Sequence, residues 1–319
     1  MSLLASVYGA GVRMRNALYE RGTLQQRTLQ GPVVSVGNLS VGGTGKTPFV
    51  LLLGQLLKQR GLKFDVLSRG YGRRTKGVAV VDPSGSAADF GDEPLLIARR
   101  LEVPVVVGEQ RYEAGIAAEA KFGPQLHLLD DGFQHRELAR DFDIVLVSPD
   151  DARDRLLPAG RLREPLSSLS RADVLVLPRA APPDLVPQPG KPIWRVRRWI
   201  TPPPVSSRPI AFCGIGRPQN FFAQLRLVGI GTAAEATYRD HHFYTERDVL
   251  DLLALKDRSE GDGFVTTEKD AINLGKYFSA LQPLAVIPVQ MELLDSANAI
   301  DTMLQIVDQK RQRREKIRG

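Results

Sequence analysis

Residues 40–47 read S-V-G-G-T-G-K-T, a pattern that could cradle the phosphates of a nucleotide between a strand and a helix. Its glycines reach backbone conformations closed to residues with a Cβ, so successive N–H groups can point at β- and γ-phosphate oxygens. Lys46 would extend its ammonium along these oxygens, Thr47 would offer its hydroxyl to Mg²⁺, and the following helix would add the positive end of its dipole. The predicted phosphate-binding residues are Ser40, Val41, Gly42, Gly43, Thr44, Gly45, Lys46 and Thr47.

The residues around this loop support the prediction. Ser40 stands where the pattern usually has its first glycine, but residues 32–36 form an apolar run just before the loop. After the loop, Pro48 fits a first helical turn, and an apolar face at helical spacing continues until Gly61. A strand, a glycine-rich turn and a helix therefore follow in the required order. The alternative is a glycine-rich loop that binds no ligand.

A second element, the apolar run 126–129, ends in the carboxylates Asp130 and Asp131. In phosphate-loop folds the strand beside the loop carries the carboxylate that holds Mg²⁺, directly or through water. Paired aspartates at a turn can also be turn formers or helix caps. We favour metal binding because the pair follows an apolar strand in a chain with a phosphate loop.

Two further clusters could move protons. Asp92, in G-D-E-P at 91–94, would be a helix N-cap or a general base for an acceptor hydroxyl. His241, in D-H-H at 240–242, could titrate near neutral pH, bind a metal or be structural. Arginines and a tyrosine that could neutralise phosphate charge, or simply face solvent, are Arg69, Tyr71, Arg73, Arg111, Arg161 and Arg163.

The elements that must position these residues follow the rhythm of an α/β fold. Apolar runs that predict strands alternate with amphipathic segments at 93–101 and 111–122 that predict crossover helices. The predicted strands cover 64–67, 78–81, 103–107, 126–129, 142–147 and 174–177. We expect a mainly parallel, phosphate-loop NTPase-type sheet flanked by helices.

A proline-rich stretch at 182–204 predicts a domain boundary. Beyond it, the apolar run 209–215, Gly216 and a helix-like segment begin a second, smaller α/β domain. Its G-I-G-R turn is only a weak dinucleotide-binding hint, because the third glycine of that pattern is missing. We therefore expect an N-terminal helix in 1–28, a phosphate-loop kinase domain in 29–200 and a smaller domain in 201–319 that closes a cleft.

Composition narrows the class of protein. The chain has 319 residues with 43% hydrophobic and 25% charged residues, enough for two domains with cores. The single cysteine, Cys213, excludes an intramolecular disulfide framework and fits the cytoplasm. Of the net charge of +7, residues 310–319 supply +5 through six basic residues and one glutamate. This tail is solvated or faces an anionic surface, and no nucleic-acid-binding motif or protein-partner signal accompanies it.

The first twelve residues carry no charged side chain and precede arginines at 13, 15, 21 and 27. Leu3, Leu4, Val7, Tyr8 and Val12 would lie near one helical face, which could enter a membrane interface or pack on the domain. No apolar stretch reaches the ~18–20 residues of a membrane-spanning helix, and no signal-peptide cleavage pattern is evident.

Together these motifs resemble the tetraacyldisaccharide 4′-kinase (lipid A 4′-kinase) family, over nearly the whole chain. The matching segments are G-N-L-S-V-G-G-T-G-K-T-P at 37–48, S-R-G-Y-G-R at 68–73, G-D-E-P at 91–94, D-D-G-F-Q-H at 130–135, L-P-A-G-R-L-R-E-P at 157–165 and V-T-T-E-K-D-A at 265–271. Within these motifs, Gln134 and Glu164 are further candidates for contacts with the substrate.

The resemblance implies an enzyme of lipid A (lipopolysaccharide) biosynthesis that uses ATP and Mg²⁺ to phosphorylate the 4′-hydroxyl of an acylated glucosamine disaccharide 1-phosphate. It implies a peripheral protein at the cytoplasmic face of a bacterial inner membrane, with an N-terminal membrane-associating helix. It also implies that Lys46 and Thr47 serve phosphate and Mg²⁺, that Asp130 and Asp131 are the metal-side carboxylates, and that Asp92 is the base, paired with His241.

The rival interpretation is a membrane-associated ATPase switch of the partitioning and nitrogenase-reductase group, whose loop reads K-G-G-x-G-K-[ST]. Val41 occupies the place of that group's first lysine. This argues against a sandwich dimer that uses the lysine, but leaves other phosphate-loop switches open.

Overall fold

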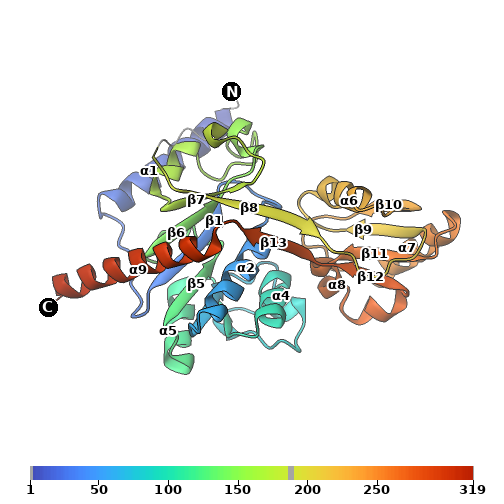
Figure 1. The fold of residues 1–319 in the computed structure, drawn as a ribbon, viewed down its shortest axis with the longest axis horizontal. Helices are drawn as coiled ribbons and strands as arrows, with labels where there is room; N and C mark the ends of the chain where they lie inside the picture. The colour runs from blue at the N-terminus through green and yellow to red at the C-terminus, as the bar shows by residue number, and fades with distance from the viewer. Residues whose placement is uncertain (1–2, 186–189, 319) are drawn as a thin grey trace.

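The computed structural model describes residues 3–185 and 190–318 and contains two sheets, a larger one and a smaller one (Figure 1). Parts of three predicted segments lie outside the described residues: 1–2 of the N-terminal helix, 186–189 of the proline-rich stretch and Gly319 of the basic tail. The larger sheet carries the phosphate loop, and the smaller sheet stands beside it at the right of Figure 1.

The larger sheet has nine strands in the order β13-β8-β7-β6-β1-β5-β2-β4-β3. Only β3 and β13 pair antiparallel with their neighbours, so the sheet is mainly parallel, as predicted. Its strands are β1 (Val33–Asn38), β2 (Phe64–Ser68), β3 (Ala79–Val80), β4 (Val105–Val107), β5 (Leu126–Asp130), β6 (Phe142–Leu146), β7 (Val174–Pro178), β8 (Ile193–Ile200) and β13 (Val289–Leu293).

Both faces of this sheet are covered, which explains why its inner strands read as continuous apolar runs. On one face, α2 (Lys46–Gln59), α4 (Asp92–Leu101) and α9 (Ser296–Arg318) bury a core that includes Phe49 and Ile300. On the other face, α5 (Arg111–Phe122) packs with Leu67 and Leu129, and the loops after β6 cover the rest. Shorter helical segments are α3 (Ala87–Phe90), Asp151–Arg153, Leu166–Arg171, Pro183–Leu185 and Gly275–Ala280.

The smaller sheet has four parallel strands in the order β10-β9-β11-β12. They are β9 (Pro209–Cys213), β10 (Ala234–Thr237), β11 (Gly263–Thr267) and β12 (Leu284–Ile287), flanked by α6 (Pro218–Leu227), α7 (Glu246–Arg258) and α8 (Glu268–Leu274). Phe222 and Phe212 belong to separate apolar clusters on its two faces. Cys213 is fully buried at the end of β9.

The chain crosses between the sheets twice, along β8 and back along β13. These strands pair antiparallel, with Val289 opposite Ile200 (Figure 1). We expected residues 201–319 to form the smaller unit, but β13 and α9 belong to the larger sheet and its core. The proline-rich stretch marks where the chain leaves the larger sheet, but nothing in it indicates that residues 289–318 return to that sheet.

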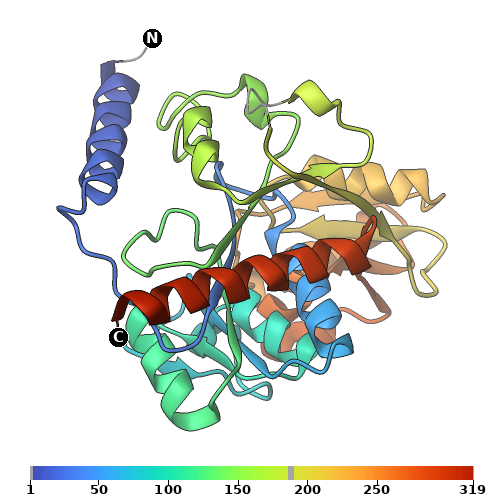
Figure 2. The same ribbon diagram turned by 60° about the vertical axis from the view of Figure 1, so that its left-hand side comes forward.

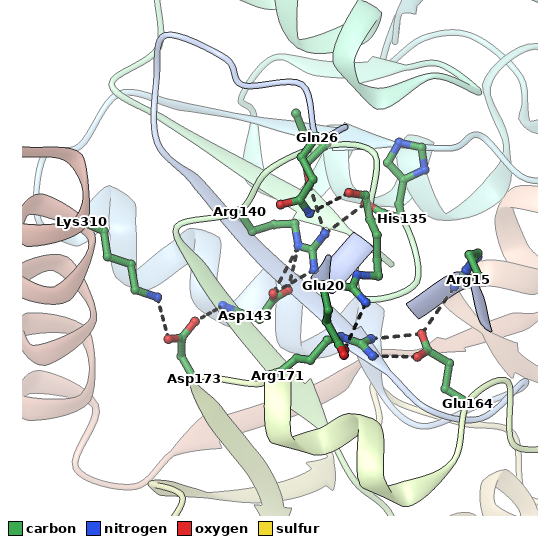
Figure 3. Close-up of polar contacts among 12 residues, drawn as sticks. Arg15, Glu20, Gln26, His135, Arg140, Asp143, Glu164, Arg171, Asp173 and Lys310 are labelled. Carbon is green, nitrogen blue, oxygen red and sulfur yellow. Dashed lines mark hydrogen bonds and ion pairs between the residues drawn. The ribbon is translucent and has the colours of Figure 1, made fainter. Parts of the chain in front are cut away.

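The N-terminal helix, α1 (Leu3–Glu20), stands at the outer edge of the molecule (Figure 2). It is tied to the body by polar contacts: Tyr8 donates to the carbonyl of Arg163 at 3.0 Å, and Asn16 donates to the Glu164 carboxylate at 2.8 Å. Figure 3 shows Arg15 and Arg171 on either side of the same carboxylate. Among the described residues, no helix is long and apolar enough to cross a membrane.

Candidate active site

The phosphate loop joins β1 to α2 at the carboxyl edge of the larger sheet. Gly42 and Gly45 have φ of 82° and 87°, the left-handed region in which a side chain is strained, and Gly45 caps α2. Asn38 pins the loop from the end of β1, donating to the carbonyl of Ser40 and the hydroxyl of Thr44, both at 2.7 Å. All eight predicted loop residues line a cavity of about 430 Å³.

Lys46 lies over its own loop. Its Nζ donates to Asn38 Oδ1 at 3.0 Å and lies 3.6 Å from Asp131 Oδ1. The ammonium is therefore held at the loop, beside the carboxylates that end β5.

Asp130 and Asp131 differ in what they can still bind. Asp130 Oδ2 accepts a hydrogen bond from Ser68 at 2.9 Å, whereas its buried Oδ1 has no hydrogen-bond partner among the described residues. Burial, with the nearby charges of Glu93 and Asp131, raises the pKa of Asp130 to about 7. Asp131 accepts two hydrogen bonds from Arg163, at 2.8 and 2.7 Å. Burial alone would raise the pKa of Asp131, but Lys46 and Arg163 outweigh it and hold the pKa below its usual range.

These donors fit a magnesium ion. An unpaired carboxylate oxygen on Asp130 and the hydroxyl of Thr47 line the same cavity as the phosphate loop. Mg²⁺ is commonly held by one or two protein oxygens together with water and substrate phosphates. No group of three or more potential metal-ligating side chains occurs in residues 3–185 and 190–318, so the site lacks an all-protein cage.

Asp92 and His241 meet across the cavity. Asp92 is the first residue of α4, whose N-cap is Gly91, so the N-cap alternative for Asp92 is wrong. The Nδ1–H of His241 donates to the Asp92 carboxylate, with 2.9 Å to either oxygen. Burial alone would raise the pKa of Asp92, but Lys269, His241 and Asn273 outweigh it and hold the pKa at about 2. Burial lowers the pKa of His241, but the bond to Asp92 outweighs it, and the net shift is upward.

Of the residues predicted to meet phosphate or sugar, Arg69, Tyr71 and Arg163 line the cavity. The ring of Tyr71 lies 5.0 Å from that of His241, measured between centroids. Arg111 is buried outside the cavity lining, and burial with the nearby charge of Arg69 lowers its pKa to about 10. It lies close enough to Asp131 to lower the pKa of that carboxyl.

Four other candidates also lie outside the cavity lining. Arg73 folds back onto the carbonyl of Gly77, and Gln134 donates to the carbonyl of Asn38 at 3.0 Å. Arg161 reaches the carbonyl of Gly216 in the smaller unit at 3.4 Å. Glu164 is fully buried and bound by Arg171 and Asn16, so it anchors α1 (Figure 3).

The smaller unit touches the phosphate loop through its G-I-G-R turn. A Cβ on Gly216 would lie 2.8 Å from the Cα of Gly42 and from the nitrogen of Gly43, so only glycine fits this approach. The next residue, Arg217, pairs with Asp150 of the larger unit at 2.7 Å. This turn therefore packs on the phosphate loop.

Sequence reasoning missed three polar residues of the cavity region. Lys269 and Asn273, both on α8, lie 3.9 and 3.0 Å from Asp92 Oδ2. Arg198 of β8 lines this cavity and a neighbouring one of about 450 Å³, also beside the phosphate loop. In the sequence, only the V-T-T-E-K-D motif pointed to any of these residues. It contains Lys269 but does not indicate which carboxylates the lysine would contact.

Comparisons with known proteins place the chain in a family. The family model described as tetraacyldisaccharide-1-P 4′-kinase matches residues 1–308. A tetraacyldisaccharide 4′-kinase of Koribacter versatilis is 50% identical over 320 residues, covering 97% of this chain and 99% of that protein. The corresponding protein of Aquifex aeolicus is 40% identical over 288 residues, covering 85% and 88%.

A solved structure has the same fold. It is described as the apo form of LpxK from Aquifex aeolicus in complex with ATP, and it matches with a TM-score of 0.77 and 35% sequence identity. The match covers 95% of this chain and 97% of that one. The resemblance noted from the motifs is therefore confirmed, and the chain belongs to the tetraacyldisaccharide-1-phosphate 4′-kinase family.

Proposed function

We propose that the cleft between the two units transfers the γ-phosphate of ATP to the 4′-hydroxyl of a tetraacyldisaccharide 1-phosphate. The observation that carries the proposal is the placement of Asp92, with His241, in the same cavity as the phosphate loop. The sugar hydroxyl, the carboxylate that accepts its proton and the ATP that donates the phosphate would then lie in one cavity, as phosphoryl transfer requires.

The loop amides and Lys46 bind the β- and γ-phosphates. Lys46 would exchange its present partners, Asn38 and Asp131, for phosphate oxygens. Thr47 and Asp130 would hold Mg²⁺, which when bound neutralises charge on the phosphates. Asp131 keeps Arg163 oriented toward the cavity, and Arg69 and Tyr71 are placed to contact the acceptor.

In the transfer, the 4′-oxygen forms a bond to the γ-phosphorus, the bond from that phosphorus to the β,γ-bridging oxygen breaks, and ADP leaves. The hydroxyl proton passes to the Asp92 carboxylate. A carboxylate with a pKa of about 2 is a weak base. It therefore orients the hydroxyl first and takes the proton late, when the new bond has made that proton acidic.

The acceptor's acyl chains stay in a bilayer, so we propose that α1 brings the enzyme to the cytoplasmic face of the inner membrane. Leu4, Val7 and Met14 lie on one side of α1 and are 67%, 64% and 66% exposed, which is high for apolar residues. Asn16, on the opposite side, and Tyr8, at the edge of the stripe, hold the helix to the body. An apolar stripe on a docked helix is suited to lying in the interface.

The test of the reaction measures ATP consumption and 4′-phosphorylated product with and without a purified tetraacyldisaccharide 1-phosphate. We expect product to form in step with ADP, and Lys46→Ala to abolish both. Lys63→Ala, at an exposed lysine outside the cavity lining, serves as the control and should retain activity. Equal ATP turnover without the glycolipid would favour the switch interpretation instead.

The test of the membrane role is flotation with vesicles that contain anionic lipid. We expect the double variant Val7→Asp, Met14→Asp to lose most vesicle binding while its contacts to the body stay intact. Leu227→Asp removes an even more exposed apolar residue, 85% exposed, from α6, and this variant should bind like the wild type. If the double variant binds vesicles as well as Leu227→Asp does, the apolar stripe is not the anchor.

A further inference from the structure

Lys269 lies among three carboxylates beside the active-site cavity. Its Nζ is 3.2 Å from Glu93 Oε1, 3.6 Å from Asp240 Oδ1 and 3.9 Å from Asp92 Oδ2. The side chain is only 16% exposed, so these charges are poorly screened by water. A single ammonium therefore holds together three negative groups.

The three carboxylates come from both sides of the cleft. Asp92 and Glu93 begin α4 of the larger unit, whereas Asp240 and Lys269 belong to the smaller unit. Asp240 Oδ2 also lies 3.8 Å from His241 Nε2. Without the ammonium, carboxylates of the two units would face one another, and like charges at such distances repel.

We propose that Lys269 is a positioning residue for phosphoryl transfer, because its ammonium holds the Asp92–His241 pair, Glu93 and Asp240 in one charged arrangement across the cleft. The proposal rests on the role proposed above for Asp92. Lys269 reaches the reaction through Asp92, and Asn273 assists by donating to Asp92 Oδ2 at 3.0 Å.

Charged side chains surround Asp92 on several elements. Glu93 comes from α4, Asp240 and His241 from the segment after β10, and Lys269 from α8; Lys46 of the phosphate loop acts on Glu93. Burial lowers the pKa of Lys269, but the three carboxylates outweigh it and raise the pKa, so the ammonium persists at all working pH values. Removing it takes a permanent positive charge away from Asp92, which then keeps its hydrogen bond to His241.

The test replaces Lys269 with methionine, which keeps most of the length of the side chain and removes the charge. We expect kcat for glycolipid phosphorylation at about pH 7.5 to fall about 10- to 100-fold, as for lost supporting partners of a reacting group. The KM for ATP should stay within about threefold. The acid limb of the kcat profile should move up by about one to three pH units, the usual effect of an opposite charge on a neighbouring carboxylate. Lys269→Arg should restore much of the activity.

Arg100→Met is the matched control. Arg100 pairs with Glu268, so this variant also removes an ion pair between α4 and α8, but one outside the surroundings of Asp92. It should leave the pH profile of kcat unchanged. If Arg100→Met and Lys269→Met shift the profile equally, Lys269 contributes only to the interface and the proposal is overturned.

The variant Asp92→Asn distinguishes the role proposed for Lys269 from the role proposed for Asp92 itself. Retention of kcat in Asp92→Asn would refute the role of Asp92 itself. A large loss in Asp92→Asn, together with a wild-type rate and pH profile in Lys269→Met, would refute the role of Lys269 alone. Thermal unfolding of each variant verifies that the rates refer to folded protein.

Discussion

Two histidine–carboxylate pairs among the described residues differ in their surroundings: His127 with Asp65, buried within the larger sheet, and His241 with Asp92, at the cavity. His127 of β5 donates from Nδ1 to Asp65 of β2 at 2.9 Å, the same distance as between His241 and Asp92. Both members of the first pair have no exposed side-chain surface, and both belong to strands of one sheet. The second pair joins two units and lines the cavity.

The second nitrogen of each imidazole makes the difference. His127 Nε2 lies 3.2 Å from Glu119 Oε1, so a carboxylate occupies both nitrogens and neither can meet a ligand. His241 Nε2 lies 3.8 Å from Asp240 Oδ2, beyond hydrogen-bond distance, and the ring lines the cavity. The same pair of residue types is therefore enclosed within the larger sheet in one place and open to the cavity in the other. The two pairs differ in whether a ligand can reach the imidazole, and in whether their residues come from one sheet or from two units.

Removing the acid from each pair in turn should have the largest effect. Asp92→Asn should lower kcat by about 10²- to 10⁴-fold with little change in ATP affinity, the range for a lost general base. Asp65→Asn should leave the kcat of the folded enzyme within about threefold, because Asp65 lies outside the cavity lining. Steady-state kinetics on both variants would check this, and similar losses of kcat would remove the distinction.

Asp65→Asn, which should leave kcat nearly unchanged, should instead lower the stability of the protein. Asp65→Asn takes the carboxylate partner from the buried His127 ring, and removing one partner of a buried charge pair typically costs about 3–5 kcal/mol. We expect a loss of that order in the free energy of unfolding, measured by urea denaturation. A variant as stable as the wild type would mean that the pair does not contribute to folding.

A smaller effect should appear in the pH dependence of stability. Burial lowers the pKa of His127, but Asp65 and Glu119 outweigh it, so the folded pKa lies above the unfolded value of 6.5. The stability that the charged ring contributes is complete below about pH 6.5 and is lost as pH rises through the folded pKa. The stability gap between wild type and His127→Gln should therefore narrow as the pH rises above about 6.5. A constant gap would indicate that the ring is neutral.

Much of the larger sheet could be predicted from the sequence, because its inner strands are short apolar runs and its helices have one apolar face. The phosphate loop, Asp130 and Asp131 were placed by the same logic, since they end buried strands. The pairing of Asp92 with His241 came only from the family resemblance, because 149 residues separate them and neither motif indicates the other.

Side-chain direction limited the remaining predictions. Arg163 and Glu164 are neighbours in one motif, yet Arg163 binds Asp131 beside the cavity, whereas Glu164 binds Asn16 and Arg171 under α1. Successive residues of an extended segment point to opposite sides, and sequence alone does not say which side holds the ligand. Lys269 was missed for a related reason, because its three partners come from distant parts of the chain.

The adjoining strands β8 and β13 have a consequence for how such an enzyme could arise. Ile200 and Val289 are paired neighbours, so the 88 residues between them begin and end at the same place. A segment with adjoining ends can be gained or exchanged in one piece without stretching its host. A single recombination event could thus insert the whole segment into an ancestral nucleotide-binding domain. That domain would gain both the turn that packs on the phosphate loop and the histidine that contacts Asp92.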